Sequence, residues 1–117
     1  MRAMTAAREW SFAAVDLVPG TTTKFRLERG GRALDGFVVR VGDEYHAYLN
    51  RCPHVGAPLD LWPNEFLSED GRLLVCSTHG AVFEPDTGAC VGGPCAGDRL
   101  TRLTVRRDGD RVVVRAD

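Results

Sequence analysis

Several features are missing from this 117-residue sequence, and each absence removes a class of protein. No apolar run approaches the roughly 18 to 20 residues that a membrane-spanning helix needs. The first residues carry charges at Arg2, Arg8 and Glu9 and lack the apolar core of a secretory signal. An excess of positive charge is also missing, because 15 Lys and Arg residues face 16 Asp and Glu residues. We therefore expect a cytoplasmic protein that binds neither nucleic acid nor a membrane.

Amphipathic helical periodicity is scarce as well. Short runs rich in β-branched and aromatic residues alternate with turn signals such as Gly30-Gly31 and Asp108-Gly109-Asp110. A chain of this length supports one hydrophobic core, so we expect a single domain over residues 1–117. The pattern predicts an all-β fold, an antiparallel sandwich or barrel. The expected strands are 10–15, 22–28, 36–41, 45–50, 72–76, 101–107 and 111–115.

Two longer stretches, residues 50–71 and 84–99, do not fit this scheme because Pro and Gly recur too often for paired strands. The first contains Cys52-x-His54, and Cys76-x-x-His79 follows the strand expected at 72–76. Two thiolates and two imidazoles form a complete set of four metal ligands. Structural zinc uses this set, and so does a [2Fe–2S] cluster in which two histidines replace two cysteines on one iron. The ligand types alone do not separate the two.

The residues around the four ligands resemble the Rieske family, and specifically the small Rieske-type ferredoxins. Three motifs carry the resemblance: Cys-x-His-x-Gly-x-Pro-Leu at 52–59, Cys-x-x-His-Gly-x-x-Phe at 76–83, and Gly93-Pro94 with the later Leu100. The resemblance implies a small cluster-binding subdomain at about residues 50–99, built from two ligand loops and a proline loop. It also implies one [2Fe–2S] cluster per chain, with Cys52, His54, Cys76 and His79 as its ligands.

The same resemblance implies a one-electron carrier that passes electrons from a flavin-dependent reductase to a terminal oxygenase. With His54 and His79 assigned to the cluster, only His46 remains, so a mononuclear iron site with two histidines cannot be built. A dinucleotide-binding fingerprint is also missing. We therefore expect a monomeric electron-transfer component that is not itself an enzyme. The alternatives are a small Rieske subunit of a nitrite-reductase-like enzyme and a zinc-stabilised binding module.

Other residues of the kinds that bind metals have simpler interpretations. His46 lies in an expected strand, where a lone histidine is more often a surface or core residue than a ligand. Cys90 and Cys95 are expected to be thiols rather than a disulfide in a cytoplasmic protein. Trp10 and Trp62 are expected to be packing residues.

Charge and flanking residues lead to two further hypotheses. Residues 41–98 contain nine acidic residues and two arginines, whereas both ligand motifs lack charge, which predicts an apolar tip surrounded by acidic residues. High-potential members of the family carry a disulfide between the ligand loops, a serine and a tyrosine. In this chain Ala57 and Thr78 stand at the positions that match the disulfide, Ala81 at the position of the serine and Phe83 at that of the tyrosine. Because the disulfide and both hydroxyl groups are missing, we predict a reduction potential at the low end of the class.

Overall fold

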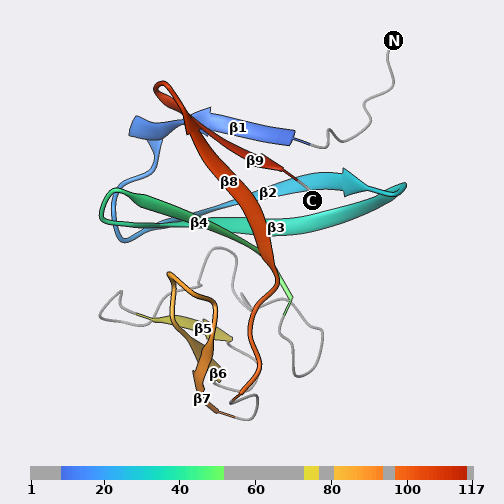
Figure 1. Cartoon of the computed structure of the whole chain (residues 1–117), viewed down its shortest axis with the longest axis vertical. Helices are drawn as coiled ribbons and strands as arrows, with labels where there is room; N and C mark the ends of the chain where they lie inside the picture. The colour runs from blue at the N-terminus through green and yellow to red at the C-terminus, as the bar shows by residue number, and fades with distance from the viewer. Residues whose placement is uncertain (1–8, 52–72, 77–80, 94–96, 116–117) are drawn as a thin grey trace.

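The computed structural model describes residues 9–51, 73–76, 81–93 and 97–115. Within these ranges the chain forms nine strands and one short 3-10 turn (Figure 1). The elements are β1 (Glu9–Ala13), η1 (Ala14–Asp16), β2 (Thr22–Arg29), β3 (Arg32–Val41), β4 (Glu44–Leu49), β5 (Leu74–Cys76), β6 (Ala81–Phe83), β7 (Cys90–Gly92), β8 (Arg102–Asp108) and β9 (Arg111–Arg115). Across the described residues, no helix is long and apolar enough to cross a membrane.

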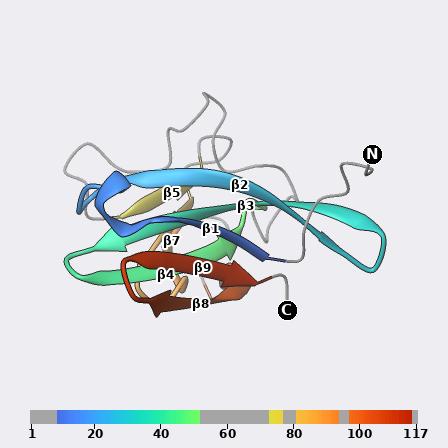
Figure 2. The same ribbon diagram turned by 90° about the horizontal axis from the view of Figure 1, so that it is seen from above.

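The strands form two antiparallel sheets, which confirms the all-β fold class. The larger sheet has six strands in the order β1-β9-β8-β4-β3-β2, and the smaller has three in the order β5-β6-β7. The two outer strands of the larger sheet approach each other, since Trp10 of β1 stacks on Phe25 of β2 with ring centroids 5.3 Å apart. Figure 2 shows the strands of the large sheet arranged as a nearly closed ring, and the stacking contact confirms Trp10 as a packing residue. The small sheet lies beyond one end of the large one (Figure 1).

The β2–β3 hairpin follows from its turn residues. Gly30 and Gly31 adopt φ values of 60° and 80°, and the flanking Arg29 and Arg32 are paired across the strands. Two successive residues with positive φ give a turn whose twist matches that of the strands, and glycine adopts this conformation most readily. This hairpin extends β3 to Arg32, four positions before the expected start at residue 36.

The buried side chains form two clusters that meet at β3 and β4. Phe37 and Val39 face a cluster shared with the small sheet, whereas Val38 faces the interior of the large sheet. On β4, Tyr48 belongs to the first cluster and Ala47 to the second. Successive strand residues point to opposite faces, so β3 and β4 are covered on both sides and join the two sheets.

Most expected strands are found with shifted ends, but three expectations were wrong. The strand expected at 10–15 ends at Ala13, because the chain turns into η1 there. The three residues of β6 lie within a segment expected to be a ligand loop, and β7 lies within the stretch 84–99 that was expected to be irregular. Both are strands because β6 pairs with β5 on one side and β7 on the other, burying Ala81, Phe83 and Cys90.

Candidate metal centre

Of the four predicted ligands, the structure describes Cys76, while Cys52, His54 and His79 lie outside the described residues. Cys76 is the last residue of β5, is fully buried, and is paired with Ala81 of β6. The second predicted ligand loop therefore connects two paired strands of the small sheet. In the described ranges no three His, Cys, Asp or Glu residues gather around a point that could hold a metal ion. That result leaves the complete ligand set a prediction.

The first predicted ligand loop leaves from the large sheet. It begins directly after Arg51, two residues past the end of β4. The chain is firmly held at this point, because Leu49 N donates to Thr101 O at 2.9 Å and Asn50 N donates to Asp35 O at 2.9 Å. Asn50 is itself buried. The two predicted pairs of ligands are thus attached to different sheets.

The surroundings of Cys76 suit a metal-bound thiolate. The residue lies in a buried cluster that includes Phe37, Leu74, Ala81 and Phe83. Apolar surroundings disfavour a thiolate that has no cation beside it, and bound iron would supply the positive charge that such a thiolate needs. A cysteine that ends a strand beside a short connection can present its sulfur to such a centre. Cys76, the one predicted ligand within the described residues, therefore has surroundings that fit a thiolate ligand of a [2Fe–2S] cluster.

The chain around the predicted proline loop is closed by backbone hydrogen bonds. Cys90 N donates to Asp98 O at 2.9 Å, and Leu100 N donates to Gly88 O at 2.8 Å. Pro94 and Cys95 of this loop lie outside the described residues, and so does the expectation that Cys95 is a thiol rather than part of a disulfide. Cys90 is buried on β7, and its Sγ donates to Gly92 O at 3.2 Å. Trp62 also lies outside the described residues.

His46, Glu44, Tyr48 and Arg102 form a polar network that the sequence did not indicate. His46 on β4 is buried, with its Nδ1 2.6 Å from Arg102 Nη2 and its Nε2 3.1 Å from Glu44 Oε1. Because arginine has no acceptor, Nδ1 must accept from Arg102 and Nε2 must donate to Glu44. His46 is therefore a packed residue with two specific partners. Alternation of strand faces could have placed His46 on the same face of β4 as Tyr48, but no local pattern could have named Arg102.

Tyr48 is the buried member of the same network. Its ring is fully buried, its hydroxyl donates to Pro85 O at 2.7 Å, and it accepts from Arg102 Nη1 at 3.2 Å. Burial raises the pKa of Tyr48 from 10.0 to about 12, although the Arg102 charge acts in the opposite direction. The hydroxyl consequently remains a donor over the whole physiological range.

This shift predicts a loss of stability at alkaline pH. Between about pH 10 and pH 12 the unfolded chain loses the Tyr48 proton while the folded chain retains it, so the free energy of unfolding falls as the pH rises through that window. Thermal unfolding followed by circular dichroism at pH 9 and pH 11 measures the effect. Tyr48→Phe has no proton to lose and should show a smaller drop between the two values. Equal drops in both proteins would contradict the assignment.

Comparisons with known proteins agree with this architecture. The model of the Rieske [2Fe-2S] domain matches residues 10–114. Ferredoxin CarAc of Metapseudomonas resinovorans is 36% identical over 83 residues, which cover 71% of this chain and 70% of that protein.

Solved structures extend the similarity to almost the whole chain. The ferredoxin of carbazole 1,9a-dioxygenase from Nocardioides aromaticivorans IC177 matches with a TM-score of 0.71 and 28% identity over 97% of this chain and 99% of that one. A chain in the complex of reduced oxygenase and oxidized ferredoxin in carbazole 1,9a-dioxygenase matches with a TM-score of 0.73 and 30% identity, covering 94% of each chain. The family match and the shared fold identify the expected cofactor as a [2Fe–2S] cluster, and the chain belongs to the Rieske [2Fe-2S] family.

Proposed function

We propose that this protein is a one-electron carrier, a Rieske ferredoxin that supplies a terminal oxygenase. The observation that carries the proposal is the match to a dioxygenase ferredoxin over nearly the full length of both chains. The relatives that this chain matches over most of their own length are ferredoxins, which supports electron transfer and no catalysis of its own. The same similarity favours the ferredoxin over a nitrite-reductase-like subunit and over a zinc-stabilised module.

The proposed cluster ligands are Cys52, His54, Cys76 and His79. We propose that the chain is a single domain over residues 1–117 and binds one cluster. When bound, the cluster takes up and releases one electron. The cluster-binding portion, about residues 50–99, includes the small sheet, which supports the second ligand loop at both of its ends. Leu74 on β5 and Phe83 on β6 are fully buried in the cluster that both sheets share, so the strands at the two ends of that loop are packed against the interior. Such a frame keeps the ligand geometry similar in both oxidation states.

The proposed partners are a terminal oxygenase and a flavin-dependent reductase. A matching structure contains ferredoxin in complex with the oxygenase of carbazole 1,9a-dioxygenase, which supports the first partner. We also propose a flavin-dependent reductase as the electron donor, a monomeric state and a cytoplasmic location. These three proposals rest on the resemblance to Rieske-type ferredoxins and on the composition of the chain. Anaerobic stopped-flow mixing of the reduced protein with an oxygenase of this class tests the carrier role. The reduced protein should pass one electron to the oxygenase within the turnover time of that oxygenase. A cluster that stays reduced when mixed with such oxygenases would contradict the carrier role.

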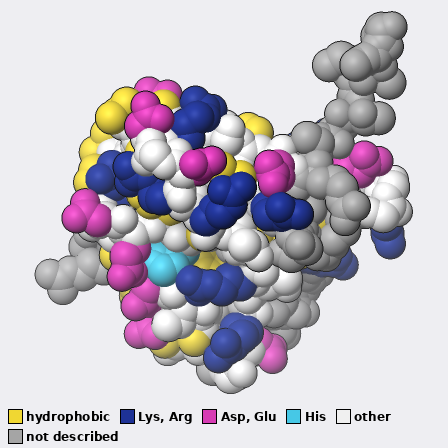
Figure 3. All heavy atoms as spheres, turned by 45° about the horizontal axis from the view of Figure 1, so that its top comes forward, with side chains coloured by type: hydrophobic (Ala, Val, Ile, Leu, Met, Phe, Trp, Pro, Cys, Tyr) yellow, Lys and Arg dark blue, Asp and Glu magenta, His cyan; other side chains and the backbone are white. Residues whose placement is uncertain are grey.

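The charges near the small sheet predict that electron transfer slows as salt is added. Glu84, Asp86 and Asp98 are exposed on the segments that flank β7, and Val91 on β7 is an exposed apolar residue, 51% accessible. Acidic groups around an apolar tip attract a basic partner as it approaches. Dissolved salt screens this attraction between charges that are farther apart than the Debye length, which is about 10 Å at 0.1 M salt. Figure 3 shows that Lys and Arg side chains are interspersed with Asp and Glu side chains on the face turned to the viewer.

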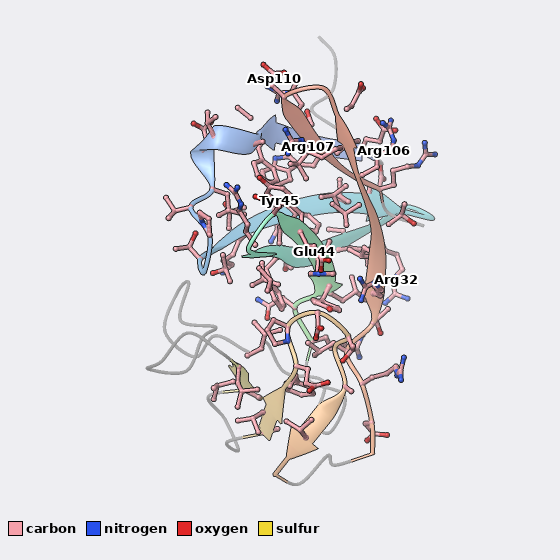
Figure 4. The ribbon with its side chains drawn as sticks, turned by 60° about the vertical axis from the view of Figure 1, so that its left-hand side comes forward. Arg32, Glu44, Tyr45, Arg106, Arg107 and Asp110 are labelled. Atoms are coloured by element: carbon pink, nitrogen blue, oxygen red, sulfur yellow. The ribbon has the colours of Figure 1, made fainter. Side chains whose placement is uncertain are left out.

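A matched pair of variants separates steering from a general charge effect. Asp98→Asn removes an acid next to the proline loop, whereas Asp110→Asn removes one at the β8–β9 turn, at the far end of the molecule (Figure 4). We expect the bimolecular rate constant to fall with ionic strength in the wild type and in Asp110→Asn, and to fall less steeply in Asp98→Asn. A rate constant that does not change with salt would count against steering.

A further inference from the structure

The connection between β6 and β7 is bound to the large sheet by two side chains from different strands. The Tyr48 hydroxyl on β4 donates to Pro85 O at 2.7 Å, and Arg102 Nη1 on β8 donates to Asp86 O at 2.9 Å. These partners are 37 and 16 positions apart in the sequence. Consecutive carbonyl groups of one turn are therefore held by neighbouring strands of the other sheet.

Arg102 is fixed in place by the remaining members of the network. Its Nη1 also lies 3.2 Å from the Tyr48 hydroxyl, its Nη2 lies 2.6 Å from His46 Nδ1, and its guanidinium carbon is 5.6 Å from the centre of the Tyr48 ring. A planar guanidinium offers several donors in a fixed arrangement, which an ammonium group does not. One side chain thus connects β8, β4 and the β6–β7 turn.

The turn also packs directly on Tyr48. Gly88 has a φ of 77°, and a Cβ at this position would lie 2.8 Å from Tyr48 Cε1. The carbonyl of Gly88 accepts from Leu100 N at 2.8 Å, which fixes the other side of the turn. The backbone of residues 84–88 is consequently held between the Tyr48 ring and the segment that leads into β8.

We propose that Arg102, together with Tyr48, is a positioning residue that sets the spacing between the two pairs of cluster ligands. The inference rests on the proposed function, which assigns Cys52 and His54 to a loop leaving β4 and Cys76 and His79 to the loop between β5 and β6. The first loop is attached to the large sheet after Arg51, and the second is attached to the small sheet at Cys76 and Ala81. Among the described residues, the docking of the two sheets relates these two attachment points to each other. The Arg102 and Tyr48 contacts contribute polar interactions to that docking, beside the buried cluster that both sheets share.

The test compares two arginines of the same strand in the iron-loaded protein. Arg102→Ala removes the contacts to Asp86 O, Tyr48 and His46, whereas Arg106→Ala removes only long surface pairs to Glu9 and Asp108, at 4.0 and 3.8 Å. Figure 4 shows Arg106 on the part of β8 that lies away from the small sheet. We expect Arg102→Ala to lose iron to a chelator about 10-fold faster than wild type, a factor that corresponds to roughly one net hydrogen bond. Its reduced-state EPR spectrum should be broadened, because the ligand geometry is less uniform.

Arg106→Ala should match the wild type in both measurements, and Arg102→Lys should fall between Arg102→Ala and wild type. Tyr48→Phe keeps the ring and removes the hydroxyl, so it provides the same test if Arg102→Ala does not fold. It should also broaden the spectrum. The inference is overturned if the Arg102 and Tyr48 variants retain wild-type spectra and iron-release rates. Wild-type protein without iron would instead refute the proposed function, which is a separate result.

Discussion

Cys76→Ser is expected to give a colourless protein without iron or acid-labile sulfide, whereas the wild type should contain about two of each per chain. A thiolate is a far better ligand for an iron–sulfur cluster than an alcohol, so loss of one sulfur removes the whole centre rather than weakening it. Substitution of Cys52, His54 or His79 should have the same effect. Iron and sulfide analysis with visible absorption measures the result.

Cys90→Ser is the matched control for this prediction. Cys90 and Cys76 are both buried in the same hydrophobic cluster, so a serine at either position carries a comparable cost of burying a hydroxyl. A serine at 90 can still donate to Gly92 O, as the thiol does at 3.2 Å. Cys90→Ser should therefore keep its colour, and so should Cys95→Ser. Loss of colour in either one would mean that the ligands are misassigned, and a colourless wild type with one zinc ion would favour the binding module.

A reduction potential of about −150 to −100 mV is the second large effect that we expect, at the low end of a range that extends to about +300 mV. The whole range corresponds to roughly 10 kcal/mol for one electron. Donors to the cluster sulfurs and exposure to solvent set the value within it. Ala81 and Phe83 are fully buried on β6, and neither side chain has a hydroxyl to stabilise the added electron. Protein-film voltammetry near neutral pH gives the potential directly, and a clearly positive value would contradict the low-potential assignment.

Ala81→Ser tests the cause of the low potential. Ala81 is paired with Cys76 and fully buried, so the added hydroxyl either donates to the cluster or is buried without a partner. We expect the first outcome, with a potential raised by tens of millivolts. Val82→Ser is the control, because successive strand residues point to opposite faces and its hydroxyl faces away from the Ala81 side. Equal shifts in the two variants would exclude a specific hydrogen bond.

Local sequence determined the parts of this protein that depend on neighbouring residues. Gly30-Gly31 and Asp108-Gly109-Asp110 produce the two hairpins that they predict, because turn conformation depends on a few consecutive residues. The β-rich runs became β2, β3, β4, β8 and β9 with ends shifted by a few positions. The spacing of Cys52, His54, Cys76 and His79 within their flanking motifs was sufficient to indicate the family that the comparisons then showed.

The tertiary structure alone decided which distant residues meet. β6 and β7 have three residues each, too few for a periodic pattern, and they are strands because β5 and the shared hydrophobic cluster lie beside them. Arg102 and His46 are 56 positions apart, and neither residue type predicts the other. The turn at Pro85 resembles an ordinary loop in the sequence, yet its carbonyl is bound by Tyr48. Such contacts depend on how the sheets pack, and packing is a property of the whole chain rather than of any segment.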